Sequence, residues 1–137
     1  MALRGLLLAA ILIGLAGCAD TSVDRSRCQQ ASAAQIAAIR AGVKGVTPRN
    51  DVRSGYAVKS TDRQNVYFVA AKIYGNGIEQ GAGPGVWAMG GTPDRPASVM
   101  AVDGYAKEFS DWGPGDRTAA QVTMFEDGVA EAKACAR

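Results

Sequence analysis

The sequence predicts an α+β domain, a four-stranded antiparallel sheet with N- and C-terminal helices packed on one face. Apolar residues recur at helical spacing near the start and the end of the chain. Between them, residues 56–102 contain short runs rich in β-branched and aromatic side chains. These runs follow one another with short connections and no helical segment, which is typical of an antiparallel meander and not of a parallel sheet.

The first helix is expected to begin after Ser32, because Ser32 and Gln35 have the spacing of a capping box. Three apolar residues then fall on one face of this helix, Ile36, Ile39 and Val43. Gly42 offers a left-handed C-terminal cap. So short a helix is marginal alone in water, so its apolar face must pack against another element. Residues 45–53, which include Pro48, are expected to form a loop.

The four strands are expected at 56–59, 65–74, 86–89 and 97–102. The second is the strongest, since it is dense in β-branched and aromatic residues. Residues 61–64 are polar and suit a hairpin connection between the first two strands. A Gly-rich loop at 75–85 and a turn cluster at 90–96 connect the others.

The C-terminal part predicts a short helical segment and then a longer helix. Tyr105, Phe109 and Trp112 fall at helical spacing, which suits one or two turns. Thr123 and Glu126 fit a second capping box at the start of the last helix. The apolar face of that helix would contain Phe125, Val129, Ala132 and Ala136. Residues 119–122 suit either an extension of this helix or a fifth strand.

The N-terminus has the pattern of a secretory signal peptide. A short head carrying Arg4 precedes an apolar run from Leu6 to Ala16, and small residues follow. The run is too short to cross a bilayer as a helix, which needs about 20 apolar residues. The chain is therefore expected to leave the cytoplasm.

Leu15-Ala16-Gly17-Cys18 closes this signal and resembles the lipobox of bacterial lipoproteins. The resemblance implies that the thiol of Cys18 receives a diacylglyceryl group and that Cys18 becomes the first residue of the mature chain. The alternative is an ordinary secretory signal in which the cysteine is incidental. If Cys18 is lipidated, residues 1–17 are the lipoprotein signal peptide, residues 18–27 are the lipidated cysteine and a polar tether, and residues 28–137 form a single α+β domain.

The lipidated chain is expected on the extracytoplasmic face of the cell membrane. Two or three acyl chains hold a protein there essentially permanently, since each buried CH₂ contributes ~0.8 kcal/mol. Ala19, and not an aspartate that would favour membrane retention in Gram-negative lipoproteins, follows the cysteine. The outer membrane is therefore open as a destination if the host has one.

Three cysteines are present, and lipidation would consume Cys18. Cys28 and Cys135 remain as an even pair in an oxidising compartment, where disulfides form and persist. The sequence therefore predicts one disulfide that joins the two ends of the domain. The N- and C-terminal helices, packed next to each other on one face of the sheet, are expected to bring the pair together.

Composition argues against several classes of function. The formal charge is +2 for the whole chain and +1 once Arg4 is removed, without a basic block, so nucleic acid is not an expected partner. The absence of histidine removes the commonest general base and metal ligand. Four carboxylates cluster in sequence, Asp103, Glu108, Asp111 and Asp116, but their spacing does not fit a calcium loop, and they are interpreted as solvated charges. The glycines from Gly75 to Gly81 miss the spacing of a dinucleotide fingerprint. No metal or cofactor is expected.

Trp87 and Trp112 both lie beside glycines. Either could complete the core or act as an exposed anchor for a protein partner. Trp112, next to Gly113 and Pro114, is the better candidate for a partner contact.

The Ala- and Gly-rich usage, with runs such as Val66-Tyr67-Phe68-Val69-Ala70, looks like that of small uncharacterised lipoproteins of high-GC Gram-positive bacteria and their prophages. This resemblance implies no particular activity. We therefore expect a membrane-anchored, non-catalytic binding module whose partner is a protein or another envelope component. The alternatives are a prophage-type surface lipoprotein that excludes superinfecting phage and, third, a small envelope enzyme.

Overall fold

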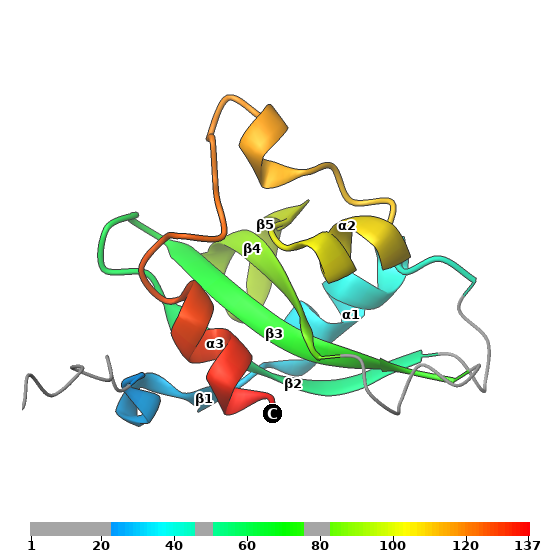
Figure 1. Ribbon diagram of the computed structural model, residues 1–137, viewed down its shortest axis with the longest axis horizontal. Helices are drawn as coiled ribbons and strands as arrows, with labels where there is room; N and C mark the ends of the chain where they lie inside the picture. Colours follow the sequence, from blue (N-terminus) through cyan, green and yellow to red (C-terminus); the bar gives the residue numbers. More distant parts are fainter. Residues whose placement is uncertain (1–22, 46–50, 76–82) are drawn as a thin grey trace, which may run out of the picture.

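The computed structural model describes residues 23–45, 51–75 and 83–137 (Figure 1). Five antiparallel strands form one sheet in the order β1-β2-β3-β4-β5, each paired with the next along the chain. The predicted α+β class and the antiparallel sheet are confirmed, but the predicted number of four strands is wrong. The additional strand, β1 (Gln29–Gln30), pairs with Ala57 and Tyr56. Its two residues are polar and exposed, so no apolar pattern indicated it.

The other strands lie close to their predicted positions but are mostly longer. They are β2 (Asp51–Lys59), β3 (Val66–Tyr74), β4 (Gly85–Thr92) and β5 (Arg95–Ala101). The start of β2 falls in the segment that was expected to be a loop, and buried Val52 explains why this part joins the sheet. The predicted turn at 90–96 is shorter in the structure, where β4 and β5 form a tight hairpin. The register of their pairing shifts between Gly90 and Gly91. Gly91 has a φ of 94°, a conformation that favours glycine.

The first and last helices pack on opposite faces of the sheet, so the prediction that they share one face is wrong. Figure 1 shows α3 (Val129–Cys135) in front of the sheet and α1 (Ala33–Gly42) behind it. Alternate residues of β3 supply the two cores. Val69, Ala71 and Ile73 pack with α1, whereas Phe68 and Ala70 pack with α3. Because β3 and β4 are apolar on both faces, each face needs its own covering helix.

The start of α1 is as predicted. The Ser32 hydroxyl accepts a hydrogen bond from the Gln35 backbone N–H, and the Gln35 side chain accepts one from the Ser32 N–H. The predicted left-handed cap at Gly42 is wrong, since Gly42 has no positive φ and is the last residue of α1. Gly42 instead lies against the Trp112 indole, which a side chain at this position would overlap.

Between β5 and the last helix lies α2 (Gly104–Phe109), in which the ring centroids of Tyr105 and Phe109 are 4.7 Å apart. Trp112 lies beyond the end of this helix. The 3₁₀ turns η1 (Arg25–Arg27) and η2 (Gly115–Arg117) complete the elements of the described residues.

The last helix begins at Val129 and not at Thr123. Gly128 precedes it with a φ of 98°, a left-handed conformation that interrupts a helix. The Thr123 N–H still donates to the Glu126 side chain, but the segment is a turn. Phe125, predicted to face the core, is therefore 88% exposed. Residues 119–122 form neither helix nor strand, although Val122 is buried against the sheet.

Candidate functional site

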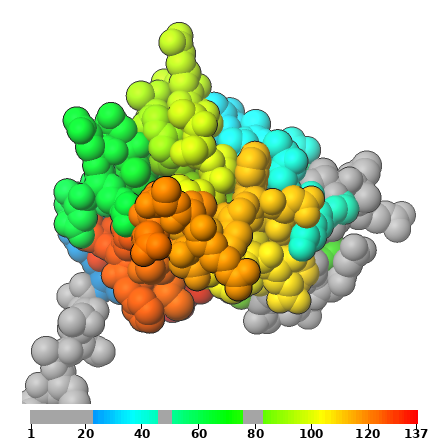
Figure 2. Space-filling view, turned by 90° about the horizontal axis from the view of Figure 1, so that it is seen from above, coloured from blue at the N-terminus to red at the C-terminus, as the bar shows by residue number. Residues whose placement is uncertain are grey.

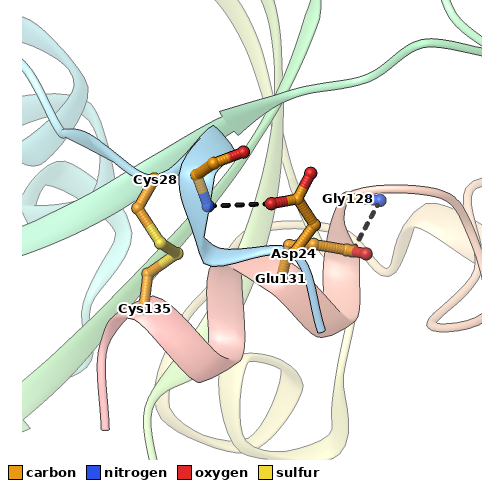
Figure 3. The surroundings of a disulfide bond; sticks show 6 residues. Asp24, Cys28, Gly128, Glu131 and Cys135 are labelled. Carbon is orange, nitrogen blue, oxygen red and sulfur yellow. Dashed lines mark hydrogen bonds between the residues drawn. A yellow bond between two sulfur atoms is a disulfide. The ribbon is translucent and has the colours of Figure 1, made fainter. Parts of the chain in front are cut away.

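The two ends of the described domain are joined at one place, between η1 and α3 (Figure 3). Cys28 and Cys135 form a disulfide with their Cα atoms 5.9 Å apart, which confirms the predicted pair. The prediction that two helices on one face bring the cysteines together is wrong. Helix α1 lies on the other face of the sheet, and η1 places Cys28 beside α3. Next to the bond, Asp24 accepts a hydrogen bond from the Ser26 N–H, and Glu131 accepts one from the Gly128 N–H.

Arg27 holds the N-terminal segment against the turn before α3. Its guanidinium donates to both carboxylate oxygens of Asp127 at 2.8 Å and to the Lys59 carbonyl oxygen at 2.7 Å. The Thr61 hydroxyl and backbone N–H also donate to Asp127, at 2.7 and 3.0 Å. Residues 24–27, expected to be the end of a polar tether, therefore belong to the ordered domain.

A second arginine holds the same turn from the other side. The guanidinium of Arg63, in the β2–β3 connection, forms an ion pair with the Glu126 carboxylate. It also donates to the Ala120 carbonyl oxygen at 2.8 Å. Residues 124 and 125 thus lie directly before two carboxylates that are each fixed by an arginine.

Three large apolar side chains are exposed on this side of the domain, Phe125 at 88%, Met124 at 52% and Val23 at 38%. We call them the Phe125 patch. Two shallow hollows, of about 240 and 230 Å³, flank the patch and share Met124. Figure 2, which views the molecule from above, shows the orange segment around residues 115–125 near the centre of the view and the yellow-green β4–β5 turn projecting at the upper edge.

Each hollow contains a lysine that is paired with a carboxylate. Lys133, in the hollow that also contains Val23 and Arg137, lies 2.9 Å from Asp103. Lys107, in the hollow beside Phe125, lies 3.0 Å from Asp116. The positive charge beside the patch is therefore largely balanced.

The interpretation of the four clustered carboxylates as solvated is wrong for Asp103, which is only 4% exposed. One of its oxygens accepts hydrogen bonds from the N–H groups of Ala106 and Val86, at 2.9 and 3.2 Å, and so caps α2 and joins it to β4. The other oxygen faces Lys133 of α3. Val86 and Lys133 lie 17 and 30 positions from Asp103 in sequence, so no local pattern predicted these contacts.

The two tryptophans have different surroundings. Trp87 is fully buried and donates its indole N–H to the Ser110 hydroxyl at 3.1 Å, which confirms it as a core residue. Trp112 is half-buried, packs against the core beneath α1 and donates to the Ile39 carbonyl oxygen at 3.3 Å. Only the remaining exposed edge of Trp112 is a candidate for partner contact.

Cys18 lies outside the described residues, as does most of the Gly75–Gly81 segment. Within the described ranges, no three His, Cys, Asp or Glu side chains are arranged to hold a metal ion. The described helices include none with the length and apolar character needed to cross a membrane. Compared with models of protein families, with curated proteins and with solved structures, the chain shows no match.

Acid should destabilise the domain through the two arginine-bound carboxylates. Hydrogen bonds from Arg27 and then Thr61 hold the pKa of Asp127 well below its usual range, and Arg63 lowers the pKa of Glu126. Because these pKa values are lower in the folded than in the unfolded chain, their stabilisation is complete above about pH 5 and is lost progressively as the pH falls below about 4 and through the folded-state values. Thermal melts from pH 7 to pH 2 should show this decrease. Asp127→Asn should start with a lower Tm and lose less of it in acid, whereas equal losses in the two proteins would contradict the assignment.

Proposed function

We propose that this protein is a membrane-anchored extracytoplasmic lipoprotein whose domain is a non-catalytic binding module. The observation that carries the proposal is Leu15-Ala16-Gly17-Cys18 at the end of the apolar run, five residues before the described domain begins. The disulfide between Cys28 and Cys135 supports it, since structural disulfides are characteristic of compartments outside the cytosol.

We propose that the domain binds a partner and does not catalyse a reaction. The lysines in the two hollows are each engaged by a carboxylate, so their charge serves the fold. The partner proposed for the domain is a protein or another component of the cell envelope. The exposed edge of Trp112 is the candidate contact, because its indole is held in place by α1 and would lose little freedom on binding.

Replacing Cys18 tests the anchor. Cys18→Ser removes the acyl acceptor, so the protein should incorporate no labelled palmitate in cells and should not be processed to a chain beginning at residue 18. Ala19→Ser leaves the tetrapeptide intact and should label like the wild type. Palmitate incorporation into Cys18→Ser would show that the lipid is attached elsewhere and would contradict the proposal.

A further inference from the structure

We infer that the Phe125 patch rests on the same lipid bilayer that anchors Cys18, so that the domain docks on the membrane in one orientation. This inference rests on the proposed function, because it needs the lipid at Cys18. It goes further by assigning the partner of one surface, the interfacial region of the bilayer, and by stating which side of the domain faces it.

The first argument is the distance between anchor and patch. Val23 is part of the patch and follows Cys18 by five residues, so an extended chain between them spans at most ~17 Å. From Asp24 onward the chain is fixed to the domain, since Asp24 caps η1 and Arg27 binds Asp127. Asp127 is two residues from Phe125. The lipid attachment therefore holds the patch close to the bilayer surface.

The second argument is that the patch is held outward. Phe125 and Met124 precede Glu126 and Asp127, which are bound by Arg63 and Arg27. The turn is thus fixed with its phenyl ring in solvent, where an apolar side chain is unfavourable. Apolar side chains of this kind enter the boundary between headgroups and acyl chains to a depth of about 5–10 Å. A lipid surface is therefore a chemically suitable environment for the ring.

The charges around the patch agree with this placement. Arg137 borders one of the two hollows, and its long side chain can place its charge at headgroup level. Asp103 and Asp116 balance the two lysines in the hollows, so we expect an apolar contact that high salt does not release. The connection keeps Val23 within ~17 Å of the acylated cysteine, so the patch meets the lipid at high effective concentration, which favours the bilayer over a protein as its partner.

A single fluorescent probe tests the docking in the full lipidated protein. With Cys18 acylated and Cys28 bonded to Cys135, Phe125→Cys provides one free thiol for an environment-sensitive dye. The matched control is Asp94→Cys in the β4–β5 turn, which is exposed on the α1 side, where the Ser32 hydroxyl donates to the Pro93 carbonyl oxygen. Each labelled protein is reconstituted into vesicles of phosphatidylcholine and phosphatidylglycerol.

The probe at position 125 should emit at shorter wavelength and be quenched by nitroxide-labelled acyl chains, at low and at high salt. The probe at position 94 should remain water-like and unquenched. A water-like probe at 125 in protein that floats with the vesicles would overturn the docking and leave the anchor intact. Equal quenching at both positions, or a shift at 125 that depends on protein density, would also overturn it. Failure of the protein to float with vesicles would contradict the anchor itself.

Discussion

Replacing Cys28 and Cys135 together with alanine should lower the free energy of unfolding by about 2–5 kcal/mol. The bond joins residues 107 apart in sequence, and for a loop of about 100 residues the chain-entropy model gives ~4.7 kcal/mol. Typical domains are stable by only ~5–15 kcal/mol, so this loss would leave the fold marginal. Urea unfolding of the two proteins measures the difference.

The wild-type protein with its disulfide reduced is the matched control and should unfold at nearly the same urea concentration as the double variant. Thiol titration of the unfolded, unreduced wild-type domain should find neither cysteine reactive. Equal stability of the oxidised wild type and the double variant would show that the bond does not stabilise this fold.

Asp103→Ala should lower the free energy of unfolding by about 2–4 kcal/mol, the largest effect expected from a single side chain. The carboxylate caps α2, and caps are typically worth ~0.5–2 kcal/mol. Its removal also leaves the buried Val86 N–H without its acceptor, which costs about 1–3 kcal/mol. The same urea measurement gives the result.

Asp116→Ala is the control for loss of a carboxylate from an ion pair, because Asp116 meets Lys107 at the surface. Exposed pairs contribute only ~0–1 kcal/mol. Asp103→Asn keeps an acceptor for the two N–H groups and should fall between the two alanine variants. If Asp103→Ala and Asp116→Ala were equally stable, the proposed role of Asp103 in joining α2, β4 and α3 would be wrong.

Local signals predicted the elements that depend on local interactions. The capping box at Ser32 placed the start of α1 at the correct residue, and the apolar run at 65–74 placed β3 to within a residue. The layer arrangement was less predictable, because β3 reads as a nearly continuous apolar segment and gives no preferred face. Its alternation between two cores, with Phe68 on one side and Val69 on the other, requires a helix on each face.

The disulfide was predicted from the even cysteine pair and the expected oxidising compartment, but no sequence pattern predicted the Phe125 patch. Thr123 and Glu126 resembled a helix start and so placed Phe125 on a buried face. The ion pairs that hold the turn instead link residues 63 and 100 positions apart in sequence. Asp127-Gly128 was the one local signal that could have placed the helix start later, since this dipeptide favours a turn.

The mass of the protein isolated from membranes tests the central claim most directly. We expect a mature chain that lacks residues 1–17 and carries acyl-containing mass on its first residue, Cys18. Fragmentation of the N-terminal peptide should place the lipid on this cysteine, with Cys28 and Cys135 still joined. A chain that retains residues 1–17, or one cleaved elsewhere with an unmodified Cys18, would contradict the account.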